Sequence, residues 1–464
     1  MPLQRLPLLA AGPLAALPDG FRGLAGFPIR YAQPALRLRL ERPAGRAAGK
    51  LLLVVGLDCR FEAALTFEAP WAGWSQRLDA SFVSSAQRLY VELPEAVVGG
   101  LHAHELLVAN EGEAPLAFVA PEAEAPGLVP RVLLGRPDEP VGEALERLRE
   151  PAYAPFGWIG GCVLEGLQLL GEASGDARCR AAQEALLARY LGPQGLAFED
   201  PRGRLTTGQD ESIESTLPYA TLARLQPGHP ALETALAVWS RKRQPDGGVR
   251  DHSDTCEGNY TVAYPMMLLG RQSGDARLLD SALRQLRRRR ETLVLDGDVY
   301  LRHADGQRSF RNWTRGICWY LLGLARTLEA AERPPADLLE HLAERAAWIA
   351  ARQRPDGLWD NFLDEPGPPP DTSGSCGIAA ALLRARQAGL LEADCGELAG
   401  RAFAAAAAFL APDGYLAGVA PNNKRGEAAQ HTGRRTCEPF ALGLFGQLAA
   451  ALLRERRWSV KARA

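Results

Sequence analysis

Four polar clusters stand where the chain changes from polar to apolar sequence. They are Asp210–Glu214, Asp251–Glu257, Asn312–Trp319 and Asp371–Ser375. Each precedes an apolar stretch with helical spacing, so each is expected at the start of a helix. Two carboxylates in one partly desolvated site have their pKa values pushed apart, which keeps one of them protonated near neutral pH. Such a pair is the acid and base of glycoside hydrolysis.

The third cluster adds a cation and aromatic rings. Asn312 is expected to cap a helix, and Arg315 and Trp319 lie four residues apart on one face of its first turns. A guanidinium can bind a carboxylate through two hydrogen bonds, and an aromatic plane can stack on the C–H face of a sugar ring. The pattern therefore fits an acidic sugar. The same residues also suit a core helix, and the acids of the other clusters also suit helix capping.

The clusters belong to a repetitive part of the chain. From about residue 141, helical patterns alternate with Asp-Gly turns whose glycines are Gly247, Gly297, Gly357 and Gly414. A period of about 50–60 residues corresponds to one helical hairpin and a turn, repeated five or six times. Such hairpins pack side by side to bury their apolar faces. We expect them to close into an (α/α)6 toroid, with the clusters at one end, rather than to form an open solenoid.

The preceding residues have a different periodicity. Leu36, Leu38 and Leu40 alternate with charged residues, which is typical of a half-buried strand. Further apolar runs follow at 51–55, 61–67, 88–93, 105–109 and 117–119. The sequence predicts a tail at 1–29, a small antiparallel β-sandwich at 30–125, a linker at 126–140 and the helical barrel at 141–464.

Composition limits the function classes. The chain has 464 residues and a formal net charge of −2, so nucleic acid is not an expected partner. No uncharged span long enough for a membrane helix occurs. Eight cysteines form no Cys-x-x-Cys pair, and Pro7 and Pro13 interrupt the apolar N-terminus. We expect a soluble cytoplasmic protein, with the periplasm as the alternative, and neither cofactor nor metal. The sequence does not define the oligomeric state.

Three segments resemble a known group of enzymes. Asn312–Trp319, followed by Tyr-Leu-Leu-Gly-Leu, resembles the Trp-x-Arg-Gly-x-x-Trp signature of unsaturated uronyl hydrolases, glycoside hydrolase families 88 and 105. Tyr300–His303 and Asp371–Ser375 resemble two further segments of these families. The resemblance covers roughly residues 150–450 and implies an (α/α)6 barrel that removes a terminal uronic acid from an oligosaccharide. The alternatives are a sugar isomerase or epimerase, or a non-catalytic carbohydrate-binding protein, on the same toroid.

The resemblance also implies which acids react. Glu257 stands where these families have an essential Asp, and Glu214 falls near the position of their other cleft Asp. Glu257 is therefore the expected proton donor, since the apolar flank of its helix should desolvate it. Glu214 would act as base or orient water, with Asp254 and Asp210 as alternatives. Because both positions hold Glu here, a saturated uronide is an alternative substrate to an unsaturated one.

Further residues are expected to bind the sugar. Arg315 would hold the carboxylate, and the ring would lie against the aromatic and histidine side chains of neighbouring segments, namely Trp313, Trp319 and His303. Thr372 and Ser373 would bind its hydroxyl groups.

Overall fold

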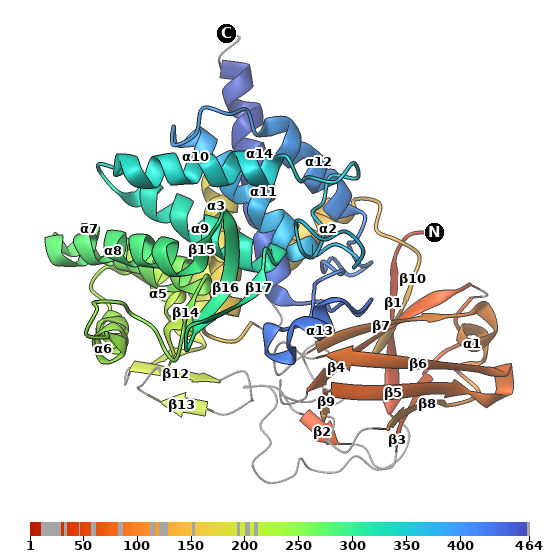
Figure 1. Cartoon of the computed structure of the whole chain (residues 1–464). Coiled ribbons are helices and arrows are strands. Elements are labelled where there is room, and N and C mark those ends of the chain that lie inside the picture. Colours follow the sequence, from red (N-terminus) through yellow and green to blue (C-terminus); the bar gives the residue numbers. More distant parts are fainter. Residues whose placement is uncertain are drawn as a thin grey trace.

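The computed structural model describes residues 1–10, 29–31, 35–45, 47–56, 62–81, 87–111, 117–119, 129–150, 154–192, 195–199, 205–207 and 212–461. A β-domain from the N-terminal part of the chain lies beside a helical barrel (Figure 1). None of the helices in these ranges is long and apolar enough to span a membrane.

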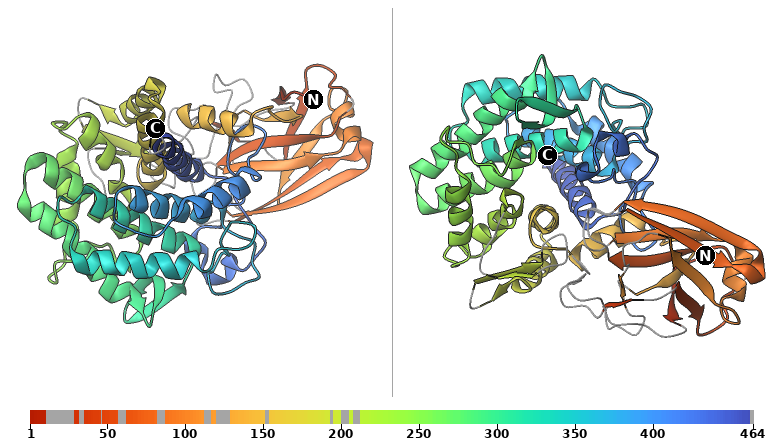
Figure 2. Two further views of the ribbon diagram at one scale, coloured as in Figure 1. Left: turned by 90° about the horizontal axis from the view of Figure 1, so that it is seen from above. Right: turned by 60° about the horizontal axis from the view of Figure 1, so that its bottom comes forward.

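Within the described residues, the barrel consists of six inner and six outer helices that alternate along the chain (Figure 2). The inner helices are α3 Trp158–Ser174, α5 Pro218–Leu225, α7 Tyr264–Ser273, α9 Thr314–Ala330, α11 Thr372–Gln387 and α14 Pro439–Lys461. The outer helices are α2 Pro140–Arg149, α4 Ala177–Ala188, α6 Leu232–Lys242, α8 Ala276–Leu293, α10 Ala336–Ala350 and α12 Gly396–Ala407. Since the inner helices run in the same direction, all begin at one end of the barrel. The predicted toroid is confirmed.

Glycines close the ring between its first and last inner helices. A Cβ added at Gly443 of α14 would lie 2.4 Å from the carbonyl oxygen of Cys162 in α3. A Cβ added at Gly166 would lie 2.6 Å from the carbonyl oxygen of Gly443. The two backbones therefore approach so closely that no larger residue fits at either position. This contact distinguishes a closed toroid from an open solenoid.

A repeated pentapeptide, Ser-Gly-Asp-Ala-Arg, makes two of the hairpin connections. Gly175 and Gly274 adopt φ values of 78° and 67°, which end α3 and α7. The next residues, Asp176 and Asp275, cap α4 and α8 by accepting the backbone N–H two residues later. Identical sequence thus produces the same inner-to-outer turn two repeats apart.

The start of α9 differs from the expected one. Asn312 is not its cap, because the helix begins at Thr314 after Trp313 and the cap position makes no side-chain hydrogen bond. Asn312 instead has a φ of 53°, a left-handed conformation that Asn tolerates better than most residues. Its side chain accepts from Val299 N at 3.0 Å and donates to Asp298 at 2.7 Å.

The β-domain has two layers around one apolar core. Its elements are β1 Gln4–Ala10, β2 Ile29–Tyr31, β3 Ala35–Leu40, β4 Gly49–Gly56, β5 Glu62–Ala69, β6 Trp74–Ser81, β7 Gln87–Leu93, β8 Leu106–Asn110, β9 Ala117–Val119, β10 Arg131–Leu134 and the short helix α1 Glu95–Gly100. Its strands pair antiparallel in the order β2-β9-β4-β10-β1-β3-β8-β5-β6, with β7 also on β4. The first part of β1 pairs with β10 and the second part with β3, so this strand joins the layers.

The predicted limits of this domain need correction. The range 1–29, expected as a tail, contains β1, and the range 126–140, expected as a linker, contains β10. In the sequence, Pro7 interrupts the apolar N-terminus. It lies at the last position of β1 that pairs with β10, just before the strand changes partner, where its missing N–H is tolerated. The strands β3, β4, β5, β7, β8 and β9 match the predicted runs to within a few residues.

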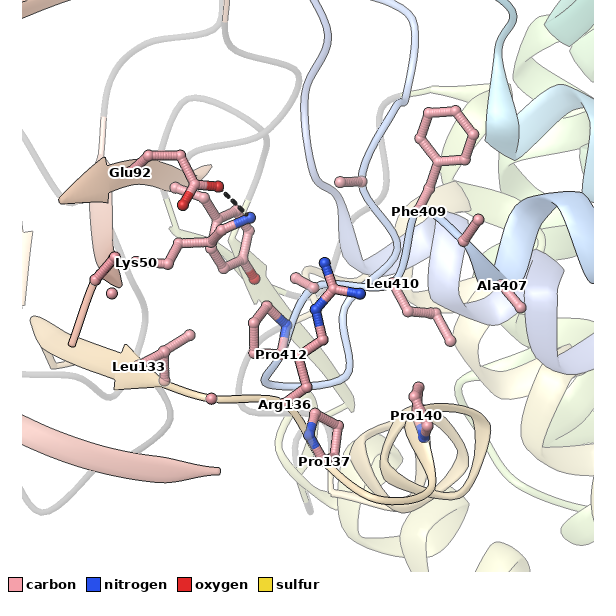
Figure 3. Close-up of a pocket in the computed structure, with 17 residues that line it drawn as sticks. Lys50, Glu92, Leu133, Arg136, Pro137, Pro140, Ala407, Phe409, Leu410 and Pro412 are labelled. Carbon is pink, nitrogen blue, oxygen red and sulfur yellow. Dashed lines mark ion pairs between the residues drawn. The ribbon is translucent and has the colours of Figure 1, made fainter. Parts of the chain in front are cut away.

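One repeated turn of the barrel binds the β-domain. Asp413, from the Pro-Asp-Gly turn after α12, accepts a hydrogen bond from Tyr90 Oη at 2.7 Å and lies 3.5 Å from the Arg88 guanidinium. A pocket of about 570 Å³ lies in the same seam, lined by residues that include Lys50, Glu92 and Phe409 (Figure 3).

Candidate active site

Two glutamates lie at the starts of successive inner helices. Glu214 belongs to the short helix η2, Ile213–Thr216, directly before α5. Glu257 comes two residues before η3, a π-helical segment at Asn259–Ala263 that continues into α7. π-Helical turns are rare and concentrate at functional sites. The toroid therefore brings together two side chains that the sequence separates by one repeat.

The two carboxyl groups influence each other's charge. Burial raises the pKa of Glu257 to about 7, and the neighbouring Glu214 contributes to this rise. Burial also raises the pKa of Glu214, with a smaller contribution from Asp251. Both side chains are half-buried rather than enclosed, as groups that meet a substrate must be. Glu257 is thus poised to hold a proton near neutral pH.

Cations oppose these shifts. Arg302 lowers the pKa of both glutamates, and Lys424 lowers that of Glu214. Arg302 lies on β16, Asp298–Ala304, where it is opposite Thr255 of the short strand β14, Asp254–Thr255. This pairing puts the guanidinium near Glu257, two residues beyond Thr255. Two cations therefore act on the acid pair.

Asp251 and Asn423 complete the immediate surroundings of the pair. Asp251 accepts from Ser212 Oγ at 2.9 Å and forms an ion pair with Lys242 at 2.8 Å. Asn423 donates from Nδ2 to Glu257 Oε1 at 3.2 Å. Ser212 also caps η2 by accepting from the backbone N–H of Glu214. These contacts hold the backbone and side chains on both sides of the two acids.

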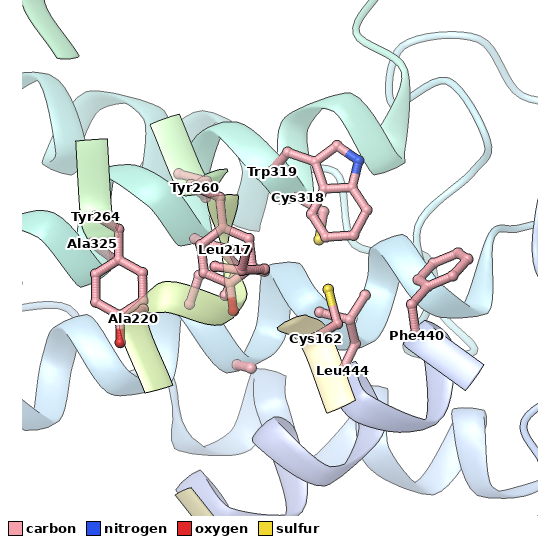
Figure 4. Close-up of a cluster of buried hydrophobic side chains, with 14 of the residues drawn as sticks. Cys162, Leu217, Ala220, Tyr260, Tyr264, Cys318, Trp319, Ala325, Phe440 and Leu444 are labelled. Carbon is pink, nitrogen blue, oxygen red and sulfur yellow. The ribbon is translucent and has the colours of Figure 1, made fainter. Parts of the chain in front are cut away.

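Aromatic side chains from three inner helices and η3 pack together in the core of the barrel (Figure 4). The ring of Trp319 lies 6.2 Å from that of Tyr260 in a parallel arrangement and 5.7 Å from that of Trp158. Phe440 of α14 contacts both tryptophans. Trp319 is 4% exposed, whereas Trp158 is half-buried. Of these two rings, Trp158 is more available for stacking on a sugar.

Arg315 and Trp313 are bound by the protein itself. The Arg315 side chain is 3% exposed and donates to the carbonyl oxygen of Ala420 at 2.7 Å and to that of Pro421. Its guanidinium also lies 4.6 Å from the Trp313 ring. Trp313 donates from Nε1 to Gln430 Oε1 at 3.2 Å. In this arrangement Arg315 presents no free fork to a carboxylate.

The hydroxyl groups at the start of α11 are also engaged. Thr372 donates to the carbonyl oxygen of Ala417 at 2.7 Å, and Ser373 donates to Asp371 Oδ1 at 2.7 Å. Asp371 caps α11 through the Ser373 N–H. Thr372, Ser373 and Asp371 are fully buried. Their hydrogen bonds stabilise the start of this helix.

The remaining predicted residues lie apart from the pair or outside the described chain. Asp254 is 3% exposed and accepts two hydrogen bonds from Arg288, at 2.9 and 3.2 Å. His303 is opposite Asp254 in the β14–β16 pairing, so it lies on the other face of β16 from Arg302. Asp210 lies outside the described residues. Of the four predicted acids, the structure brings together Glu214 and Glu257.

No motif in the sequence points to Asn423 or Lys424 as site residues. Asn423 lies 166 residues from Glu257 in the chain, in a loop without a recognisable motif. In the part of the chain that the structure describes, no group of three or more His, Cys, Asp or Glu side chains is arranged to hold a metal ion.

Comparison with known proteins identifies the group to which this barrel is related. The model of Glycosyl Hydrolase Family 88 matches residues 238–455. This part of the chain, slightly less than half of its length, is therefore similar to that family. This similarity confirms the resemblance seen in the sequence. The matched range contains Glu257, Arg302, Arg315 and Asn423, whereas Glu214 precedes it, so the support for Glu214 is its position beside Glu257.

Individual relatives agree with this placement. "Protein Atu3128" of Agrobacterium fabrum is 32% identical over 141 residues, 27% of this chain and 60% of that protein's length. The chain thus spans less than two thirds of this curated relative. A possible family 105 member from Salmonella enterica has a TM-score of 0.58 at 18% identity over 65% of this chain and 84% of that one. The unsaturated glucuronyl hydrolase of Bacillus sp. GL1 has a TM-score of 0.50 at 18% identity, with 69% and 97% covered. At such identities these two structures support the fold.

Proposed function

We propose that this glycoside hydrolase removes a terminal uronic acid from the non-reducing end of an oligosaccharide, with Glu257 as proton donor and Glu214 as its partner. The observation that carries the proposal is the raised pKa of Glu257, about 7, beside a second half-buried carboxyl group. Near neutral pH this arrangement offers one acid and one base at the same place.

The proton balance of the reaction follows from these roles. Glu257 gives its proton to the substrate as the glycosidic linkage is lost, and Glu214 accepts a proton from the water that adds. Transfer of one proton from Glu214 to Glu257 through solvent then restores the starting state. The overall reaction consumes one water molecule and needs no group beyond the two acids.

The charge around the pair supports an anionic sugar. Arg302 acts on both glutamates and Lys424 acts on Glu214, so a substrate carboxylate placed beside them meets two cations. We assign recognition of the carboxylate to Arg302 and Lys424 in place of Arg315, whose donors are bound to backbone carbonyl groups. Trp158 is the proposed stacking surface for the ring.

A substrate panel tests the proposal. An unsaturated glucuronyl disaccharide comes first because a relative of the same fold is an unsaturated glucuronyl hydrolase, and an aryl β-glucuronide and an aryl β-glucoside provide the saturated and neutral comparisons. Activity on at least one uronide and none on the glucoside supports the assignment. Activity confined to the neutral glycoside would exclude an anionic substrate.

Variants connect the activity to the named residues. We expect Glu257→Gln to lower kcat by about 10²–10⁴. We expect Arg302→Ala to raise KM for the active uronide. Glu340→Gln, on the exposed face of α10, is the matched control and should leave both parameters unchanged. A Glu257→Gln variant with full activity would show that the proton donor is another residue.

A further inference from the structure

We propose that Asn423 is a positioning residue for the proton donor and that Trp313 and Arg315 hold the loop that carries it. This loop, residues 420–430, is called the site loop below. The inference rests on the proposed function, because it assigns a partner to Glu257 in that role. It also gives the Trp-x-Arg signature a task other than contact with the sugar.

The first anchor of the site loop is the start of α9. Arg315 donates to the carbonyl oxygens of Ala420 and Pro421, the first two residues of the loop. Trp313 donates to the side chain of Gln430, the last residue of the loop. Gln430 is fully buried and donates back to the carbonyl oxygen of Pro421 at 3.1 Å. The N-cap residue and the first turn of α9 thus fix both ends of the site loop.

A second anchor joins the loop to the residues before α9. The carboxylate of Glu427, in the short helix α13 Glu427–Gln430, accepts the backbone N–H of Phe310. Phe310 has a φ of 57°, a left-handed conformation that is unusual for a bulky side chain, and Asn312 follows at 53°. Backbone strain of this kind persists only where its surroundings hold it, and it is concentrated at functional sites. The signature segment and the site loop therefore constrain each other.

Asn423 is the residue of the site loop whose side chain contacts the acid pair. Its Nδ2 donates to Glu257 Oε1 at 3.2 Å. The neighbouring Asn422 caps the short helix η4, Asn423–Arg425, by accepting from Lys424 N at 2.9 Å, which fixes the backbone at this point. A donor to a carboxyl oxygen favours the charged form, so Asn423 eases the release of the proton and holds the resulting carboxylate in place.

Other charged groups face the two acids and set the background for a pH experiment. Those acting on Glu257 are Glu214 from η2, Arg302 from β16 and, more weakly, Arg315 from α9. Those acting on Glu214 are Lys424 from the site loop, Asp251 and Arg302. Since Asn423 is uncharged, replacing it changes one hydrogen bond to Glu257 without altering this set.

The pH dependence of kcat/KM tests the role of Asn423. Loss of its donor should raise the pKa of Glu257, so in Asn423→Ala the alkaline limb moves to higher pH by about one unit, with a 10- to 100-fold lower kcat. Asn423→Asp adds a like charge and should move the limb further. Lys424→Ala should instead move the acidic limb upward, because Lys424 acts on Glu214. An unmoved alkaline limb in both Asn423 variants would overturn the proposal.

Arg315→Lys tests the anchor. A lysine keeps the charge but cannot bind both carbonyl groups in the same fork. We expect the same shift of the alkaline limb as in Asn423→Ala, and no additional shift in the double variant. Arg271→Lys is the matched control, because Arg271 also donates to a backbone carbonyl, that of Ala330, at the C-terminal ends of α7 and α9. It should leave the pH profile unchanged.

Two outcomes separate this inference from the proposed function. If Arg315→Lys raises KM for the uronide and leaves the pH profile unmoved, Arg315 binds substrate and the anchor is wrong, while the function stands. If Glu257→Gln is fully active, the function itself fails. Circular dichroism and thermal melting of each variant establish that it is folded before its kinetics are compared.

Discussion

Replacing Glu257 by Gln should make the protein less active and more stable at the same time. The carboxyl group is half-buried beside a second acid, and its pKa in the folded protein is raised from 4.5 to about 7. A raised carboxyl pKa means that the folded state binds the proton more tightly than the unfolded state. The wild type therefore loses stability as the pH rises from about 4.5 to about 7, whereas a glutamine has no charge to develop.

The magnitude follows from the size of the shift. At about 1.4 kcal/mol per unit, a rise of about 2.5 units corresponds to at most about 3.4 kcal/mol. Because the side chain is partly open to solvent, we expect about 1–2 kcal/mol. A barrel of about 320 residues has an unfolding entropy of about 0.7 kcal/mol per kelvin, so the expected rise in Tm is about 2–3 °C.

Thermal melting and kinetics on the same samples provide the assay. At pH 8 the variant should melt about 2–3 °C above the wild type, and the two should converge as the pH falls to about 4.5. Over the same range kcat of the variant should stay about 10²–10⁴ below that of the wild type. A lower Tm at pH 8 would show that the Glu257 carboxylate is stabilised in the folded protein, and the reasoning from burial would be refuted.

Three further predictions concern the support of the site. Asp254→Asn removes the carboxylate that binds Arg288, so melting should show a loss of about 1–3 kcal/mol with most activity retained. Gly443→Ala places a methyl group against the backbone of α3 and should cost about 1–3 kcal/mol, whereas Gly400→Ala in α12, with open space around it, should raise the melting temperature slightly. Glu165 of α3 is fully buried and forms ion pairs with Arg224 at 2.8 Å and Arg326 at 2.7 Å. Glu165→Gln breaks these pairs and should cost about 3 kcal/mol at pH 7 in denaturant titrations. The pKa of Glu165 is lowered to about 2, so its stabilising effect is present above pH 4.5 and this difference should narrow as the pH falls below that value.

The periodicity of the sequence was sufficient to predict the fold where side chains alternate regularly between core and solvent. The repeated turns and the apolar spacing of α9 predicted a closed ring, and the run Leu36–Leu40 predicted β3. β6 was missed because only Trp74 and Leu78 of this edge strand pack against the apolar core, and both are partly buried. β1 was missed because its proline lies where the strand changes partner. Local pattern identifies elements with a buried face, whereas strand partners are set by contacts between distant residues.

The site was predictable to a similar degree. Acids at helix starts could be located from the sequence, and the ring explains why Glu214 and Glu257 meet. The difference between Glu257 and Asp254 could not be read from their spacing, since both precede the same helix. The structure distinguishes the two acids through Arg288 of α8. This cation forms an ion pair with the buried Asp254, whereas Glu257 is the acid with a raised pKa.

The case of Arg315 shows what a signature motif can and cannot identify. Its residue types suit a carboxylate clamp, and its position at a helix start would support that role. In the folded protein the guanidinium donates hydrogen bonds to the carbonyl oxygens of Ala420 and Pro421. In the inference above, these bonds hold the loop from which Asn423 contacts Glu257. The motif would then be essential to catalysis without touching the sugar. Because Arg302 and Lys424 act on the acid pair, the proposed function assigns binding of an anionic substrate to these two cations and placement of the proton donor to Asn423. Substitutions at Arg302 should therefore change mainly KM, and substitutions at Asn423 should change mainly kcat and its pH dependence.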